Sequence, residues 1–194
     1  IKESYLLTGE LEKTNDAYAI AKIAGIKMCE NYNIQYKTNY KCLMPTNTFG
    51  PNDNYDALNS HFLPALIKKV HDLRSNNRKK LILWGTGLAK REVIYVDDLA
   101  DACIFFMKKN FFGTTINIGS GKDFSIKEYA KKILNIIIPK KKIKIKYDLS
   151  KPNGTPRKVL DIKLANKYGW RPKAKLDVAI KKTYKNFLEN NKIV

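Results

Sequence analysis

The chain has 194 residues, 44% of them hydrophobic, so it is long enough for one domain or one and a half with a sizeable core. No apolar run reaches the roughly 18 residues that span a membrane, and the first residues lack a signal-peptide pattern, so we expect a cytoplasmic protein without a membrane anchor. The net charge of +19 comes mostly from lysines scattered along the chain, which favours a solvated surface over nucleic-acid binding and suits an anionic small ligand.

In the first half of the chain, the apolar spacing predicts a long helix over residues 16–37 and a second helix over residues 61–74. Thr14, Asn15 and Asp16 are candidate N-caps of the first helix. Short strands are expected at residues 40–45 and 79–84. The turn-forming residues 46–54 predict a loop after the first strand.

In the second half, a strand is expected at residues 93–96, followed by a helix that Asp97 and Asp98 cap and that runs to Lys109. Residues 115–119 predict another strand. Ser125 and Glu128 have the form of a capping box, which opens a helix ending near residue 138. The remaining expectations are strands at residues 142–147 and 159–161 and helices at residues 162–168 and 176–190. Strands that alternate with helices predict an α/β fold with a largely parallel sheet.

The three cysteines, Cys29, Cys42 and Cys103, are widely spaced and lie in apolar surroundings. They have neither the spacing of metal ligands nor the density of a disulfide framework. We therefore expect buried, reduced thiols and no metal site.

Tyr18 and Lys22 stand four residues apart in the stretch AYAIAK, so they project from the same face of the first predicted helix. A lysine ammonium beside a phenol stabilises the phenolate. The pair can therefore donate a proton to a carbonyl oxygen, and the lysine can also hold ribose hydroxyls. The alternative is an ordinary surface pair on a helix, and the spacing alone does not decide between the two.

Two histidines and two tryptophans are further candidates. His61 precedes the second predicted helix, and an imidazole is suited to moving a proton at a carbon next to a ketone; capping or packing is its alternative. His71 has no such neighbours and is expected at the surface. Trp84 offers a face for stacking a base or sugar, or else packs in the core at the end of a strand. Trp170 is interpreted as a core residue.

Arg91 and Lys158 are the basic side chains that could each pair with a diphosphate, Arg91 as a fork and Lys158 as a point charge. Their alternative is solvated surface charge, which is the interpretation for most other lysines.

Several motifs follow one another in a fixed order along the chain. They are AYAIAKIAGIKMCE, MPTNTFGPNDN, NSHFLPAL, WGTG, REVIYVDD, INIG, SKPNGTPRKVLD and the later GW. A loop that follows a strand lies at the sheet edge where open α/β folds bind ligands. Over essentially the whole chain, this set resembles the extended short-chain dehydrogenase/reductases that act on nucleotide sugars. Within that superfamily it is most similar to the enzymes that epimerise and reduce GDP-4-keto-6-deoxy-D-mannose.

The resemblance implies the later part of a Rossmann-type parallel sheet, interleaved with a smaller α/β substrate-binding domain. Residues 1–50 and 93–120 would complete the NADP-binding Rossmann domain. Residues 51–92 and 121–194 would form the domain that binds the GDP-sugar.

The resemblance also implies NADPH as the cofactor and assigns catalytic roles. Tyr18 would protonate the 4-keto oxygen, Lys22 would bind the nicotinamide ribose, and His61 would be the acid/base of epimerisation. The residues beside the cofactor would be Tyr18, Lys22, Pro45, Thr46, Asn47, Thr48 and His61.

For the GDP-sugar, the resemblance implies contacts with Trp84, Arg91 and Lys158. Lys69 occupies a substrate-binding position that is often arginine in the family. Asn153 occupies a position of the late loop where aspartate is common, so this chain departs from the pattern there.

Three features of the family are missing from these 194 residues: the G-x-x-G-x-x-G loop for the diphosphate, the serine that completes the Ser-Tyr-Lys set, and the cysteine that assists His61. We therefore expect a fragment of a longer product that does not catalyse reduction by itself. The family is typically homodimeric. The surfaces meant for the missing half would be exposed, which predicts poor solubility or pairing with a partner chain.

Two alternatives stay open. The chain could belong to another nucleotide-sugar epimerase, dehydratase or reductase of the same superfamily, although His61 within NSHFLPAL has no purpose in a pure 4-epimerase. It could also be a lysine-rich binding module without catalysis, including one that only binds GDP-sugars.

Overall fold

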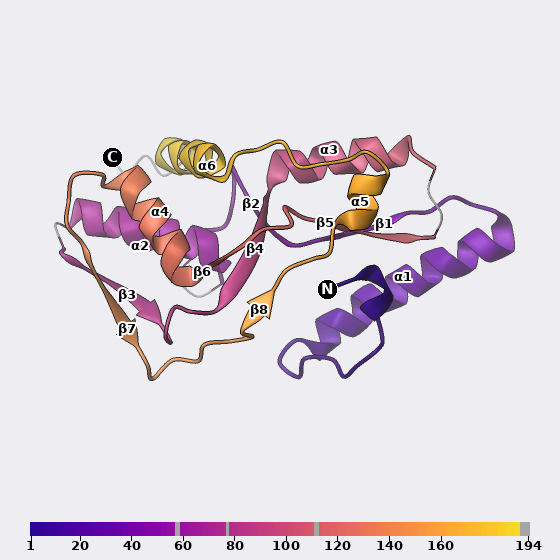
Figure 1. The fold of residues 1–194 in the computed structure, drawn as a ribbon, viewed down its shortest axis with the longest axis horizontal. Coiled ribbons are helices and arrows are strands. Elements are labelled where there is room, and N and C mark those ends of the chain that lie inside the picture. Colours follow the sequence, from indigo (N-terminus) through magenta and orange to yellow (C-terminus); the bar gives the residue numbers. More distant parts are fainter. Residues whose placement is uncertain (57–58, 77, 111–112, 191–194) are drawn as a thin grey trace.

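The computed structural model describes residues 1–56, 59–76, 78–110 and 113–190. Residues 57–58, 77 and 191–194 of the expected GDP-sugar lobe, and residues 111–112, lie outside the described part. Figure 1 shows the arrangement of the elements. In chain order they are η1 (Glu3–Tyr5), α1 (Asp16–Tyr36), β1 (Cys42–Pro45), β2 (Asn47–Phe49), α2 (Phe62–Ser75), β3 (Lys80–Trp84), β4 (Lys90–Tyr95), α3 (Val96–Met107), β5 (Thr115–Ile118), β6 (Asp123–Ser125), α4 (Ile126–Ile137), β7 (Lys144–Asp148), β8 (Arg157–Lys158), α5 (Lys163–Lys167) and α6 (Leu176–Asn190).

Strand β4 is the centre of the sheet arrangement. It pairs in parallel with β2 and β8 and antiparallel with β6. Two further parallel pairs, β1 with β5 and β3 with β7, flank it. Parallel pairing joined by helical crossovers confirms the predicted α/β class.

The side chains of β4 alternate between two hydrophobic clusters. Val93 and Tyr95 pack in a cluster built from α2, α4, α6 and β3. Ile94 packs in the other, which contains α3, β5, α5 and Trp170. Successive side chains of a strand point to opposite faces, so one strand serves both clusters. In Figure 1, α2, α4 and α6 lie toward one end of the molecule and α3 and α5 toward the other, with β4 between them.

The capping box at the start of α4 is confirmed. The Glu128 N–H donates to Ser125 Oγ at 3.2 Å, and the Ser125 N–H donates to the Glu128 carboxylate at 2.7 Å. The helices predicted over residues 16–37, 61–74 and 176–190 are also present, within two residues at each end.

Two expectations about strands are wrong. Residues 46–54 are not only loop, because β2 forms there and pairs with β4. The short strand expected at residues 159–161 lies two residues earlier, as β8. In both cases the strand is created by a partner that is distant in sequence, which a local pattern does not reveal.

Asp97 and Asp98 do not cap α3, because this helix begins at Val96 and its N-cap residue Tyr95 makes no side-chain cap bond. Asp98 is buried instead, and its carboxylate accepts from the backbone N–H groups of Lys173 at 3.0 Å and Ala174 at 3.1 Å. An aspartate at the start of a helix satisfies backbone donors, but here the donors belong to the segment that leads to α6.

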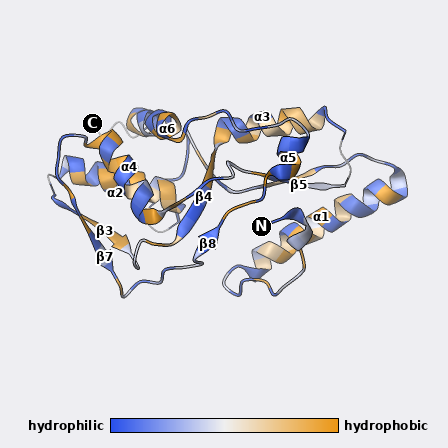
Figure 2. Ribbon diagram, viewed as in Figure 1, coloured by the Kyte–Doolittle hydropathy of each residue, from blue (hydrophilic) through white to orange (hydrophobic). Residues whose placement is uncertain are grey.

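Helix α1 has no buried residue. Its inner side is half-buried, whereas Ile20, Met28, Tyr32 and Tyr36, which follow the four-residue spacing of one helix face, are exposed. Figure 2 shows hydrophobic residues along this helix, and Figure 1 shows it at the edge of the molecule. This exposed apolar ridge is a candidate contact surface.

Single-residue expectations have mixed outcomes. Trp170 is buried, as expected, and its Nε1–H donates to Asp101 at 3.0 Å. Cys103 is exposed rather than buried, and Cys29 and Cys42 are half-buried and free. His71 is not a surface residue, since it is half-buried and its Nδ1 lies 3.0 Å from the Tyr184 hydroxyl. No helix in the described ranges combines the length and the apolar character needed to traverse a bilayer.

Replacing the cap serine should destabilise the fold. Ser125→Ala removes the acceptor for the Glu128 N–H, so the free energy of unfolding should fall by about 1 kcal/mol in urea or thermal denaturation. Lys131→Ala, at an exposed position of the same helix, is the control and should leave the free energy of unfolding nearly unchanged. Equal stability of Ser125→Ala and the wild type would contradict the role of the capping box.

The exposed ridge of α1 should cause association. We expect the wild-type chain to self-associate in sedimentation velocity, and the double substitution Ile20→Lys/Met28→Lys to shift it toward monomer, because two charges on the ridge oppose its burial. Val178→Lys, at a similarly exposed apolar position on α6, is the matched control. A wild-type monomer would refute this expectation, as would an equal shift in the control.

Candidate active site

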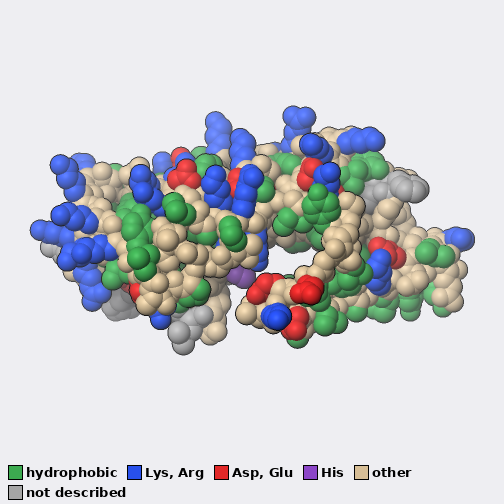
Figure 3. Space-filling view, turned by 60° about the horizontal axis from the view of Figure 1, so that its bottom comes forward, with side chains coloured by type: hydrophobic (Ala, Val, Ile, Leu, Met, Phe, Trp, Pro, Cys, Tyr) green, Lys and Arg blue, Asp and Glu red, His purple; other side chains and the backbone are tan. Residues whose placement is uncertain are grey.

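One cleft in the described part of the chain has a volume of about 820 Å³. Its walls come from the first residue, α1, the segment around β2, the start of α2 and the segment after β8. In Figure 3 the surface is hollowed between the main body and the part of the molecule that carries α1. The residues around it are Ile1, Asn15, Tyr18, Pro45, Thr46, Asn47, Thr48, Phe49, Gly50, Pro51, Asn52, Asp53, His61, Val96, Lys158, Val159 and Leu160.

Tyr18 contributes the α1 side of this cleft. Its side chain is 60% exposed, and the Nζ atom of Lys22 lies 5.3 Å from the centroid of its ring. The helical spacing therefore does bring the ammonium to the ring, as a cation–π pair. Lys22 is not one of the cleft-lining residues.

The segment Pro45–Thr48 forms the wall next to Tyr18, where β1 ends and β2 begins. The Thr46 hydroxyl donates to the Glu92 carbonyl oxygen at 3.2 Å, and the Asn47 amide donates to the same oxygen at 3.4 Å. The Thr46 N–H donates to the Ile118 carbonyl at 3.0 Å. Backbone oxygens of β4 and of the end of β5 thus fix this turn, at the edge of the sheet where α/β folds bind ligands.

His61 lies at the start of α2, with its side chain exposed to the cleft. Asp53, which also lines the cleft, is half-buried, and its Oδ2 atom has no hydrogen-bond partner within the described residues. Burial raises the pKa of Asp53, and the nearby His61 opposes that shift to a smaller extent. The sequence reasoning missed Asp53; its signal was an acidic residue inside the turn-rich stretch that precedes His61.

Lys158 is the only one of the five predicted GDP-sugar contacts that lines the cleft. It is exposed and ends β8, whose pairing with β4 sets Lys158 opposite Arg91. The segment that continues from it, Val159 and Leu160, forms the adjoining wall.

Trp84 and Lys69 form a separate exposed cluster, with Lys151, outside the cleft. The Trp84 side chain is 58% exposed, which excludes the core alternative. The ammonium groups of Lys69 and Lys151 lie 5.2 Å and 5.7 Å from the centroid of its ring. Partial burial lowers the pKa of Lys69. An aromatic face with two cations suits a planar, anionic ligand.

Arg91 and Asn153 are engaged within the protein. Arg91 Nη1 donates to the carbonyl oxygens of Lys90 and Thr155, and burial lowers the pKa of its guanidinium. The Asn153 side-chain oxygen accepts from the N–H and the hydroxyl of Thr86, at 2.7 Å and 2.8 Å. Both residues therefore tie the late loop to the strands around β4.

None of the cysteines lies among the residues around the cleft. Cys42 is half-buried beside Cys29, and this burial and neighbour raise the pKa of its thiol to about 11. Cys103 is exposed on α3. A thiol acid that works with His61 is therefore not supplied by the described residues.

Known proteins with similar sequences cover the chain almost completely. Residues 1–119 match the NAD dependent epimerase/dehydratase family. The chain is 44% identical over 190 residues to GDP-L-fucose synthase 1 of Arabidopsis thaliana, which spans 98% of this chain and 58% of the relative. It is 43% identical to GDP-L-fucose synthase of Escherichia coli K12, spanning 97% of this chain and 61% of the relative. The chain thus spans somewhat more than half the length of the curated relatives it matches.

A solved structure with a similar fold also covers almost the whole chain. A GDP-D-glycero-L-gluco-heptose synthase from Campylobacter jejuni, determined in the presence of NADPH, superposes with a TM-score of 0.84 at 33% identity. The match covers 97% of this chain and 64% of that one. From the matched residues and the shared fold, the chain belongs to the NAD dependent epimerase/dehydratase family.

Proposed function

We propose that the chain is the substrate-binding and proton-transferring part of a GDP-L-fucose synthase. The whole enzyme would convert GDP-4-keto-6-deoxy-D-mannose to GDP-L-fucose by 3,5-epimerisation and NADPH-dependent 4-reduction. The observation that carries the proposal is the single cleft onto which Tyr18, residues 45–48, His61 and Lys158 converge from distant parts of the sequence. The curated relatives at 43% to 46% identity support the same activity.

The proposal includes two interleaved lobes. Residues 1–50 and 93–120 would complete a Rossmann-type domain, and residues 51–92 and 121–194 would bind the GDP-sugar. The two hydrophobic clusters on either side of β4 support this division. Helix α5 and Trp170 are exceptions to this division. They belong to the segments that would bind the GDP-sugar, but they pack with β5 and α3.

Tyr18 would donate the proton to the 4-keto oxygen. Tyr18 lines the cleft, and the ammonium of Lys22 over its ring would stabilise the charge that the phenol gains when the proton leaves. The turn at Thr46 and Asn47, held by the Glu92 carbonyl oxygen, forms the wall against which the sugar would lie.

His61 would exchange the protons at C3 and C5. The 4-keto group makes the protons on both neighbouring carbons acidic, so one imidazole can serve both positions. Asp53, which lines the same cleft, carries a buried oxygen without a partner in the described residues and is suited to orient the imidazole of His61. The acid that protonates the opposite face of the sugar ring would come from outside these 194 residues.

The residues present fit one end of NADPH. An accessible phenol with an ammonium over its ring, next to the Pro45–Thr48 turn, suits a nicotinamide ribose. When bound, the cofactor supplies the hydride for C4. The Gly-rich diphosphate loop of Rossmann domains does not occur in this sequence, so a full cofactor site needs further chain.

Lys158 would pair with the diphosphate at the edge of the cleft. The cluster of Trp84, Lys69 and Lys151 would hold the guanine end, since a base can stack on the exposed ring. Arg91 and Asn153, engaged within the protein, would shape the late loop.

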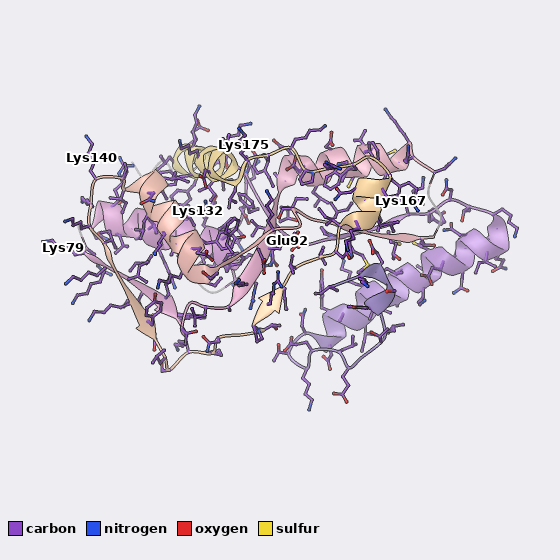
Figure 4. All side chains as sticks on the ribbon, in the orientation of Figure 1. Lys79, Glu92, Lys132, Lys140, Lys167 and Lys175 are labelled. Atoms are coloured by element: carbon purple, nitrogen blue, oxygen red, sulfur yellow. The ribbon has the colours of Figure 1, made fainter. Side chains whose placement is uncertain are left out.

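A homodimer through α1 and a cytoplasmic location complete the proposal. The exposed ridge of α1 supports the first. The three free cysteines are typical of a reducing compartment, which supports the second. The lysines labelled in Figure 4 are spread along the length of the molecule rather than gathered in one place, which favours a solvated surface over a nucleic-acid site.

A second candidate is a synthase or reductase for another GDP-sugar, favoured by the 33% identity to the Campylobacter jejuni GDP-heptose synthase. The two candidates share the GDP end of the ligand and differ in the proton chemistry required of His61.

GDP should bind to the chain through Lys158. Lys158→Met should weaken GDP binding about tenfold in isothermal titration calorimetry, because a charge-assisted contact to phosphate is lost. Lys167→Met removes an exposed lysine on α5, outside the cleft, and serves as the control. A wild-type chain without affinity for GDP, or an equal loss in the control, would refute the proposed site.

Proton exchange should depend on His61. In D₂O, the chain should catalyse loss of the C3 and C5 proton signals of GDP-4-keto-6-deoxy-D-mannose, followed by NMR, and His61→Asn should abolish it. His71→Asn, which removes the other histidine outside the cleft, should retain exchange if its melting curve shows a folded protein. Exchange that persists in His61→Asn would refute the role of His61, and a wild-type chain without exchange would favour a plain 4-reductase or 4-epimerase.

A further inference from the structure

Glu92 lies in the middle of β4 and is completely buried. Figure 4 shows its position in the middle of the molecule. A carboxylate without access to water is rare unless other groups satisfy it. Its partners are hydrogen-bond donors from two segments that are far apart in sequence.

Each carboxylate oxygen of Glu92 accepts hydrogen bonds from one of these two segments. The Gly121 N–H donates to Oε1 at 2.6 Å, and the Ser120 hydroxyl lies 3.5 Å from the same atom. The Leu160 N–H donates to Oε2 at 2.7 Å. A glutamine in this place has one acceptor and one donor, so it cannot accept from both N–H groups.

Gly119 leaves the room that the carboxylate needs. A Cβ atom at this position would lie 2.3 Å from Glu92 Oε1, so any side chain there would displace the carboxylate. The glycine that ends the INIG motif therefore has a steric reason in this structure.

The hydrogen bond from Leu160 attaches the segment after β8 to β4 at a point where the two strands no longer pair. The pairing of β4 with β8 ends at Arg91 and Lys158. Two residues later, the Glu92 carboxylate takes the N–H of Leu160, in the wall that contains Lys158. The backbone oxygen of Glu92 meanwhile holds Thr46 and Asn47 in the opposite wall.

Stability alone does not account for the carboxylate. Burial raises the pKa of Glu92 despite the hydrogen bonds from Leu160, Gly121 and Ser120. An acid whose pKa is higher in the folded than in the unfolded state lowers folding stability once the pH exceeds its unfolded value. The buried acid of Glu92 therefore contributes less to folding stability as the pH rises above its unfolded pKa.

We propose that Glu92 is a positioning residue, which holds residues 158–160 at the rim of the cleft so that the Lys158 ammonium faces an anionic ligand. Glu92 does not itself line the cleft and acts only through this segment. The inference rests on the proposed function in one respect, namely that the anionic ligand is the diphosphate of a GDP-sugar.

The test uses the full 194-residue chain, with Glu92→Gln and Gly119→Ala as independent variants. The first removes one of the two acceptors, and the second displaces the carboxylate without changing its charge. Amide hydrogen exchange by NMR reports on Gly121 and Leu160. GDP affinity is measured in the wild-type and the Lys158→Met backgrounds, as a double-mutant cycle.

We expect faster exchange at Leu160 in both variants, and a loss of GDP affinity on the order of fivefold that largely disappears in the Lys158→Met background. Ser125→Ala, which weakens the cap of α4 without removing a partner of the Glu92 carboxylate, should change neither quantity. Unchanged protection of Leu160 would overturn the inference, as would an equal loss of affinity with and without Lys158. If the wild-type chain binds no GDP, the proposed function fails, whereas the exchange at Leu160 still decides whether Glu92 holds the segment.

Discussion

Strand β4 is the constraint on which the rest of this molecule depends. It is the common partner of three other strands, and its alternating side chains enter two separate hydrophobic clusters. A strand buried on both faces must satisfy its polar groups within the protein, and β4 does so with neighbours from widely spaced parts of the chain. The buried carboxylate of Glu92 also binds the connection between β5 and β6 and the segment that follows β8.

The cleft follows from that arrangement. Each wall is a segment that leaves or joins the sheet near β4: the turn between β1 and β2, the start of α2 and the continuation of β8. Helix α1 adds Tyr18 from the side and buries none of its own residues. The site therefore combines walls that are hydrogen-bonded to β4 with a helix whose apolar ridge has no cover within the described residues. The chain spans 57% of one Arabidopsis thaliana relative and 61% of the Escherichia coli K12 relative.

Much of the fold was predictable where the signal is local. The Ser125–Glu128 capping box and the apolar spacing of α2, α4 and α6 depend on residues within a few positions of one another. Strands β2 and β8 were missed or misplaced because they exist only through pairing with β4. Asp98 was assigned to its own helix, whereas its donors lie 75 residues and more along the chain. The first three residues of β4, with their charges, do not look like a strand, and Glu92 shows its role only through Gly121 and Leu160.

The order of the motifs in the sequence determined the family, and the types of the side chains determined the chemistry available to Tyr18, Lys22, His61 and Lys158. Those properties depend on residue types and short spacings, which are present in the chain before it folds. Only the tertiary structure decided which candidates share one cleft, that Arg91 and Asn153 are engaged by the backbone and Thr86, and that Trp84 lies apart with two lysines. The physical reason is that burial and convergence arise from contacts between distant segments, and strand pairing around β4 selects those contacts.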